Sequence, residues 1–463
     1  MARDTSFIAL TVLGGIGVAF FVASPASHAT IPANPLMWGW AVAAVGIGTG
    51  IIRSRADNGY VDIFHPLIFP LGYAAVSFLL PAWSILVDGA APLGFTAKQM
   101  HPQTAYYMFL AVLAFGLGLG VTTRKVRSNA RQLDWRPPEF ARTQMQVARL
   151  LLLVPLGLSV WNLVRGGLGA RGLNQTDYGL MSTVGAFALI VTPLAVVMLT
   201  TAHRERGKRG ILPASDWALL ISLAVLSGYA GNRGAMIAIA IVLLYAITRK
   251  RTSPIKVAAG FGAVLVAVAA VVNYRSAVVS RSEFALDLEA TVTDLGVATF
   301  TTGITAQQVP DTMPFAGGGT YAAAVARQLP SPIANALFGP PDDTGSQAFR
   351  DMLSFTNPHQ GFGYSLPAEG YLNFGTVGLV AACFIFGLVV ARSHSRAAWP
   401  ANTSSALLYP VVLAALPMAL RSDALGTIKS VLYPLIAAGL VLAWSRAAAA
   451  RKSTVATRRR AVR

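Results

Sequence analysis

Long apolar runs recur along the whole chain and constrain its fold more than any other feature. Most of the runs are about 17 to 22 residues long, close to the roughly 20 residues that an α-helix needs to cross a bilayer core, and a few are shorter. Of the 463 residues, 54% are hydrophobic and only 12% are charged, whereas a soluble domain carries about 25% charged residues. The sequence therefore predicts an all-α, polytopic membrane protein with about twelve transmembrane helices.

The predicted helices follow one another through short connectors, apart from one long connector between the ninth and the tenth. We therefore divide the chain into a first membrane segment with nine helices, a loop domain, a second membrane segment with three helices and a basic tail. These parts are residues 1–272, 273–366, 367–445 and 446–463. The third predicted helix, residues 64–87, contains Pro66, Pro70 and Pro81, which predict kinks.

The distribution of charge predicts how these helices are oriented. With the N-terminus in the cytoplasm, the cytoplasmic segments hold 27 of the 37 Lys and Arg residues and 7 of the 19 Asp and Glu residues. Positive residues near helix ends stay on the inner side of the membrane. We therefore expect a multi-pass protein of the plasma (inner) membrane with both termini in the cytoplasm. The net charge of +18 is then a topology signal, and we expect no nucleic-acid partner.

The same frame places the long connector, residues 273–366, on the outer face of the membrane. Connectors of this length are often functional. Residues 284–300 mix apolar and acidic side chains at a spacing that suits an interfacial amphipathic helix, and residues 321–329 are a second short helix candidate. Ser365 followed by Pro367 predicts the start of the tenth helix, with Ser as N-cap and Pro in the first turn.

Arginine residues on the predicted outer face are candidate ligands for phosphate groups. Because positively charged residues are disfavoured on the outer face, the presence of each arginine there requires an explanation. The planar guanidinium suits phosphate, and the glycines beside Arg233 let a ligand approach the backbone closely. The alternative is that these side chains reach lipid headgroups or pair with nearby acids. The candidates are Arg165, Arg171, Arg233, Arg275, Arg281 and Arg421.

His359 and Glu369 are the candidate catalytic residues. His359 lies shortly before the tenth predicted helix, and a histidine that titrates near neutrality can take a proton from a hydroxyl group. Glu369 lies in the first turn of that helix, where free N–H groups and the helix dipole favour anions. Plainer interpretations stay open, namely a hydrogen-bonding surface histidine and an ordinary carboxylate at a helix N-terminus.

The sequence shows no sign of a cofactor. Cys383 is the one cysteine, so a multi-cysteine metal site is excluded. No Gly-rich loop with Lys-Ser/Thr marks a nucleotide site, and no paired His, Cys or carboxylate spacing marks a metal. The first outer loop, residues 25–35, contains no acid, which disfavours a metal-dependent glycosyltransferase with a catalytic acid there. We expect no cofactor.

Two glycine-rich segments resemble O-antigen (oligosaccharide repeat-unit) polymerases of the Wzy type. They are residues 227–235 (SGYAGNRGA) and residues 361–375 (GFGYSLPAEGYLNFG), and the large outer loop lies between them. The related O-antigen ligases carry a His in the equivalent late loop, followed by Asn, Ser or Gln and then spaced glycines. His359, Gln360 and Gly370 fit that pattern, whereas Asn373 stands where a small residue or Tyr is expected.

The resemblance implies a GT-C-like fold and metal-independent glycosyl transfer at the outer face of the membrane. The substrate would be a polyprenyl-diphosphate-linked oligosaccharide, with the arginines on the diphosphate and His359 or Glu369 as base. The lipid bilayer would be one partner and a chain-length regulator another. Two alternatives stay open, a lipid-linked oligosaccharide flippase or other transporter and an O-antigen-ligase-like glycan transferase. A transporter would need a polar path through the membrane, whereas ionisable residues are scarce within the predicted helices.

Overall fold

The computed structural model of the protein consists of α-helices and one short 3-10 helix in the part of the chain that it describes. The described residues are 5–23, 32–90, 96–121, 138–166, 180–205, 212–229, 233–248, 297–329, 331–339, 343–353, 363–397, 403–461 and single positions between 259 and 273.

Six of the described helices are long and apolar enough to cross a membrane. They contain Ala33–Asp57, Phe69–Leu86, Thr104–Val121, Arg142–Trp161, Leu366–Ser395 and Ala424–Val441. Shorter apolar helices accompany them in the described segments. The chain is therefore a multi-pass membrane protein, and the number of about twelve spans stays a prediction.

The chain divides into two compact units, each assembled from separate stretches of sequence. The first unit consists of Met1–Val126, Asp287–Ser395 and Leu416–Lys429. The second unit consists of Arg127–Leu286, Arg396–Ala415 and Ser430–Arg463.

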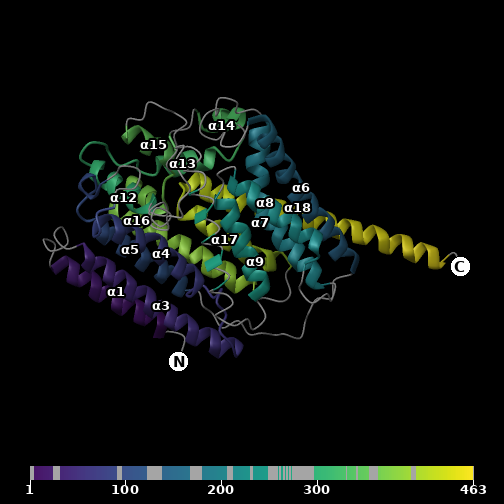
Figure 1. Cartoon of the computed structure of the whole chain (residues 1–463), viewed down its shortest axis with the longest axis horizontal. Helices are drawn as coiled ribbons and strands as arrows, with labels where there is room; N and C mark the ends of the chain where they lie inside the picture. The colour runs from purple at the N-terminus through teal and green to yellow at the C-terminus, as the bar shows by residue number, and fades with distance from the viewer. Residues whose placement is uncertain are drawn as a thin grey trace. The chain divides into compact units, whose positions relative to one another are not determined.

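Close helix packing in the first unit depends on glycine. The helices α1 (Thr5–Ala23) and α3 (Ala33–Asn58) lie side by side, and both pack on α5 (Thr104–Val121) (Figure 1). Where α5 meets α16 (Leu366–Ala397), a Cβ added to Gly118 would lie 2.9 Å from the Leu388 backbone nitrogen. Small residues let membrane helices approach this closely, so glycine brings the two backbones into contact.

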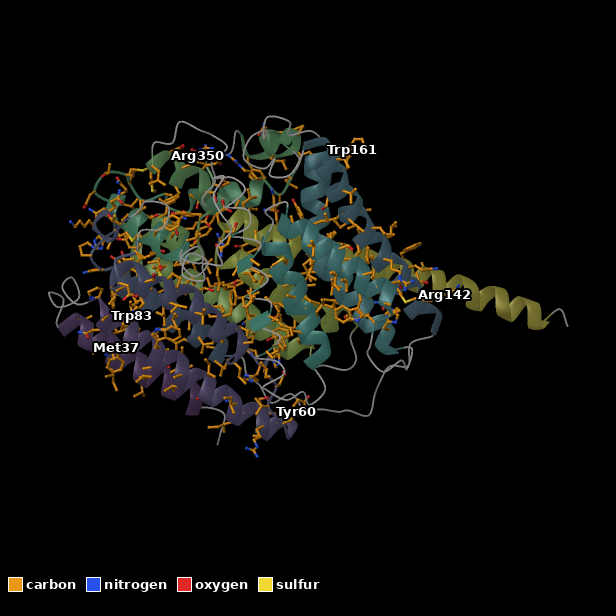
Figure 2. The ribbon with its side chains drawn as sticks, in the orientation of Figure 1. Met37, Tyr60, Trp83, Arg142, Trp161 and Arg350 are labelled. Atoms are coloured by element: carbon orange, nitrogen blue, oxygen red, sulfur yellow. The ribbon has the colours of Figure 1, made fainter. Side chains whose placement is uncertain are left out.

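The second unit contains four consecutive helices around a common apolar core. They are α6 (Pro138–Gly166), α7 (Leu180–Glu205), α8 (Ala214–Tyr229) and α9 (Arg233–Thr248). Figure 2 labels Arg142 and Trp161 on α6. The buried Asp216 carboxylate ties three of these helices together. It accepts hydrogen bonds from Arg149 Nε at 2.8 Å and Nη2 at 3.0 Å and contacts His203 Nε2 at 2.8 Å.

The connector between α3 and α4 (Phe69–Leu86) is irregular, so the predicted start of the third helix at residue 64 is too early. The Asp62 carboxylate accepts a hydrogen bond from the Phe64 N–H at 3.1 Å, and His65 Nδ1 accepts one from the Leu67 N–H at 3.3 Å. Burial, assisted by the nearby His394 ring, lowers the pKa of His65 to about 3. His65 is therefore a neutral hydrogen-bond acceptor that shapes this turn.

The segment predicted as an outer loop contains four helices among the described residues, namely α12 (Val297–Gln308), α13 (Gly319–Ala326), α14 (Ser331–Phe338) and α15 (Gly345–Met352). Residues 297–306 of α12 are all buried. Residues 297–300, which also belong to the predicted interfacial helix 284–300, therefore do not lie on a surface. Residues 284–296 lie outside the described part. The second predicted helix, residues 321–329, corresponds to α13.

Candidate functional site

The helix α16 is broken near its beginning. Phe374 (φ −144°, ψ 24°) and Gly375 (φ 63°, ψ −149°) have non-helical backbone angles. A positive φ is readily adopted only by glycine. The break separates a first arm, residues 366–373, from a second arm, residues 376–397. The prediction of one continuous tenth helix is therefore wrong.

The first arm folds back on the second. A Cβ added to Gly370 would lie 2.5 Å from the Gly378 carbonyl oxygen. In a straight helix, residues eight positions apart are about 12 Å apart. The contact is possible only because the chain reverses at the break and because neither Gly370 nor Gly378 carries a side chain.

Hydrogen bonds to α12 fix the start of the first arm. The Ser365 hydroxyl accepts a hydrogen bond from the Ala368 N–H at 3.3 Å, so Ser365 caps the helix as predicted. The same hydroxyl lies 2.8 Å from the Thr301 hydroxyl, and the Tyr364 hydroxyl lies 3.0 Å from that of Thr305. All four side chains are buried, so α12 and the first arm share a polar contact inside the first unit.

Asn373 closes the other end of the first arm. Its side-chain oxygen accepts a hydrogen bond from the Gly318 N–H at 2.9 Å. Its side-chain nitrogen donates to the Thr320 hydroxyl at 2.7 Å and to the Glu369 carbonyl at 2.8 Å. The Gly317 N–H donates to the Asn373 carbonyl at 3.2 Å. The glycine-rich turn before α13 therefore satisfies polar groups that the helix break exposes.

The Glu369 carboxylate is fully buried and links three helices. One oxygen accepts a hydrogen bond from the Thr320 hydroxyl at 2.8 Å, and the other accepts a short one from the Ala424 N–H. Ala424 is the first residue of α18 (Ala424–Ala461). Free N–H groups at a helix start favour a carboxylate, so Glu369 stabilises the N-terminus of α18. Glu369 also lies in the first turn of its own helix, α16.

Asp423 connects the same helix start with α15. Its Oδ1 accepts a hydrogen bond from the Gly426 N–H at 3.0 Å, which makes Asp423 the N-cap of α18. Its Oδ2 accepts one from the Ser346 N–H at 3.2 Å, in the first turn of α15. Two buried carboxylates, Glu369 and Asp423, therefore hold the N-terminus of α18 against α13, α15 and α16.

Arg421 lies in the turn that precedes this helix start. The turn, residues 420–423, follows α17 (Thr403–Ala419). Gly363 (φ 79°) approaches it so closely that an added Cβ would lie 3.1 Å from the Arg421 carbonyl oxygen. The half-buried Arg421 side chain is within electrostatic range of Tyr73 on α4. Lys429 is within electrostatic range of Asp423 and Arg327, so further cations lie around the two carboxylates.

Two of the predicted site residues, Glu369 and Arg421, are brought together by the structure. The Glu369 carboxylate binds the backbone of Ala424, three residues after Arg421. His359 lies outside the described residues. The remaining candidates belong to the second unit, and none of their side chains is among those described. They are Arg165, Arg171, Arg233, Arg275 and Arg281.

Sequence reasoning did not select three residues of this site: Thr320, Asn373 and Asp423. Asp423 precedes an apolar run and so had the pattern of an N-cap. Thr320 follows three glycines, and Asn373 immediately precedes the break. The hydrogen bond between them depends on the reversal of the chain at the break, which no local sequence pattern predicts. Among the described residues, no group of three His, Cys, Asp or Glu side chains could hold a metal ion.

Comparison with known proteins identifies the family. A family model described as O-antigen polysaccharide polymerase Wzy matches residues 176–449, more than half of the chain, including the described parts of the site around Glu369. No curated protein and no solved structure matches the chain. The match covers both glycine-rich segments on which the sequence resemblance was based. The chain therefore belongs to the Wzy family of O-antigen polysaccharide polymerases.

Proposed function

We propose that the protein polymerises polyprenyl-diphosphate-linked oligosaccharide repeat units by glycosyl transfer. A sugar hydroxyl of one lipid-linked unit attacks the anomeric carbon of the glycan on a second one. The bond between that carbon and the diphosphate oxygen breaks, and polyprenyl diphosphate leaves with the electron pair. The hydroxyl proton passes to a base. The observation that carries this proposal is the link between Glu369 and the Arg421 turn in a chain of the Wzy family.

Arg421 is the diphosphate ligand in this proposal. Negative charge develops on the leaving diphosphate, and a fixed guanidinium stabilises it in the transition state. Because both oxygens of the buried Glu369 carboxylate already accept hydrogen bonds, we assign Glu369 to positioning the Arg421 turn. His359 is then the base, and Glu369 is the alternative base. We propose Arg165, Arg171, Arg233, Arg275 and Arg281 as further diphosphate ligands.

We also propose that the reaction takes place at the outer face of the plasma membrane, with both chain termini in the cytoplasm. The excess of Lys and Arg on one side of the predicted frame supports this orientation. A GT-C-like arrangement, a reaction without a metal ion and a chain-length regulator as partner belong to the same proposal.

The test uses purified protein in lipid vesicles and a short synthetic polyprenyl-diphosphate oligosaccharide, with EDTA present. We expect a ladder of products with repeat-unit spacing, together with released polyprenyl diphosphate. Arg421→Ala should abolish the ladder, whereas Lys98→Ala, which removes an exposed cation near α5, should retain it. Equal ladders from both variants would remove Arg421 from the site.

The same assay separates the alternatives. Movement of the lipid between leaflets without any ladder would identify a flippase. Transfer of a single glycan to another acceptor, without a repeat-unit ladder, would identify a ligase-like transferase. A ladder that forms only after addition of a divalent cation would contradict the metal-independent reaction.

A further inference from the structure

One side of the second arm of α16 consists of exposed apolar side chains. Val377, Ile385 and Val389 are exposed, and their spacing of eight and four residues puts them on one face of the helix. Ala381, between them, is exposed as well. The second arm belongs to the candidate membrane span Leu366–Ser395. Because the chain spans a membrane, this stripe is a surface that faces lipid.

Two phenylalanine rings extend the stripe to the break in α16. Phe374, at the break, is 52% exposed, and Phe315, in the connector between α12 and α13, is 43% exposed. The Phe374 Cβ lies 2.9 Å from the position of a Cβ on Gly378, and the Phe315 ring lies 3.3 Å from the position of a Cβ on Gly375. Both rings therefore lie at the start of the second arm, where Val377 is 77% exposed. We refer to Phe315, Phe374 and Val377 as the apolar patch.

Hydrogen bonds hold the backbone of this patch in place. The Ala316 N–H, directly after Phe315, donates to the Leu372 carbonyl at 3.0 Å. The Gly318 N–H donates to the Asn373 side chain at 2.9 Å. The connector is thus fixed to the end of the first arm, and its aromatic ring is exposed nevertheless. An exposed apolar surface in a fixed position indicates a site of contact with another molecule.

The neighbours of Phe315 show that the patch lies near a membrane surface. Its ring centroid is 6.4 Å from that of Tyr371, which is 5.2 Å from that of Tyr107. Tyr107 is in the first turn of α5, a candidate span, and tyrosines concentrate at the membrane–water interface. His101, just before α5, is within electrostatic range of the exposed Asp311. The predicted frame makes this the outer end of α5, in agreement with the proposed reaction at the outer face.

The polar first arm of α16 adjoins the apolar patch. Asn373 directly precedes Phe374, and its side chain donates to the Glu369 carbonyl at 2.8 Å, one helical turn earlier. The Glu369 carboxylate binds the N–H of Ala424, three residues after Arg421. The arm that positions the Arg421 turn therefore begins beside a lipid-facing aromatic surface. This junction suits a molecule that has a long apolar chain and an anionic end.

We propose that the polyprenyl chain of the lipid-linked substrate docks on the apolar patch from the outer leaflet, with its diphosphate end toward the first arm of α16. The patch differs from the rest of the stripe, because its fixed aromatic rings adjoin a polar arm. The chain is already in an apolar solvent, so its preference for the patch arises from packing against these rings rather than from the hydrophobic effect. The identity of the lipid rests on the proposed function.

The test is photo-crosslinking with the substitution Phe315→p-benzoylphenylalanine. The same substitution at Met37 is the matched control, because Met37 is 60% exposed near the start of α3, which the predicted frame also places on the outer side (Figure 2). Each full-length variant is placed in phospholipid vesicles that contain a trace of radiolabelled polyprenyl diphosphate, and is then irradiated. This probe carries no glycan, so labelling does not depend on polymer formation.

We expect about fivefold more label at Phe315 than at Met37, and loss of the excess when unlabelled polyprenyl diphosphate is added, since specific docking is a difference in affinity between two surfaces. Equal label at the two positions would indicate ordinary lipid contact and overturn the proposal. A cross-link from Phe315 to a second copy of the chain in place of the lipid would overturn it as well. If the Phe315 variant does not accumulate, the substitution is made at Val377, with the same outcomes.

Wild-type protein is assayed separately for the repeat-unit ladder. A ladder together with equal label at Phe315 and Met37 contradicts the docking surface and leaves the polymerase assignment intact. Excess label at Phe315 without a ladder contradicts the polymerase assignment and leaves the docking surface intact.

Discussion

The Thr320 hydroxyl donates a hydrogen bond to the Glu369 carboxylate at 2.8 Å, although the two residues are 49 positions apart in the sequence. The same hydroxyl accepts a hydrogen bond from Asn373 at 2.7 Å. Thr320 thus connects the glycine-rich turn before α13 with both polar side chains of the first arm. This buried hydroxyl is therefore one of the groups that fix the geometry of the broken helix.

Thr320→Val should therefore destabilise the site. Valine has nearly the shape of threonine but leaves one oxygen of the Glu369 carboxylate without a donor, which costs about 1–3 kcal/mol for a buried group. It also removes one of the two hydrogen bonds that the Asn373 amide nitrogen donates. We expect a lower thermal midpoint in detergent and a reduced rate of polymer formation. Thr320→Ser keeps the hydroxyl and should restore most of both. A Val variant that matches wild type in both measurements would contradict the role given to this hydroxyl.

The contact between Gly370 and Gly378 predicts a second, purely steric effect. Gly370→Ala places a methyl group against a backbone carbonyl that cannot rotate away. Overpacking of this kind typically costs about 1–3 kcal/mol, so we expect less folded protein, a lower thermal midpoint and loss of polymer. Gly48→Ala is the matched control, since a Cβ at that position of α3 meets nothing within 4 Å. Equal stability of the two variants would refute the fold-back of the first arm.

The helices that were predictable from the sequence are those with uninterrupted apolar runs and clear ends. The apolar run of residues 104–121 predicts the fourth membrane helix, and α5 has the same bounds, Thr104–Val121. Ser365 was recognisable as an N-cap because its signal is local, a Ser followed by Pro and an apolar run. In both cases the residues that determine the element are neighbours in the sequence.

The break in α16 and the burial of α12 were not predictable in the same way. Phe374 and Gly375 continue an apolar run, and glycine is common in membrane helices. The sequence therefore predicted one continuous helix for this segment. An interfacial helix was predicted for residues 284–300 from their mix of apolar and acidic side chains. The contacts that bury α12 are not local, because Ser365 and Tyr364, the hydrogen-bond partners of Thr301 and Thr305, are about sixty residues away. The role of Glu369 was open for the same reason, since its partners come from α13 and α18.

Arg421 should be required for polymer formation. Removing one group that stabilises developing charge commonly lowers a rate by about 100- to 1,000-fold, so Arg421→Ala should lose the repeat-unit ladder at a normal protein level. Arg421→Lys keeps the charge but not the planar fork, and we expect an intermediate rate. The assay is product formation from the lipid-linked oligosaccharide, with the thermal midpoint as a check of folding. A Lys variant as inactive as the Ala variant would show that the charge alone does not suffice.

His65 should make the stability of the protein dependent on pH. Its pKa is lowered to about 3 in the folded protein, whereas an unfolded chain takes up the proton near pH 6.5. The unfolded state therefore binds more protons between these values, and stability falls as the pH drops below about 6.5, by at most about 1.4 kcal/mol per pH unit. His65→Asn retains an acceptor for the Leu67 N–H but does not titrate. We expect the thermal midpoints of wild type and variant to change in parallel above pH 7, and the wild type to fall more steeply between pH 6.5 and 5. Parallel curves over the whole range would show that His65 is protonated in the folded protein without a penalty.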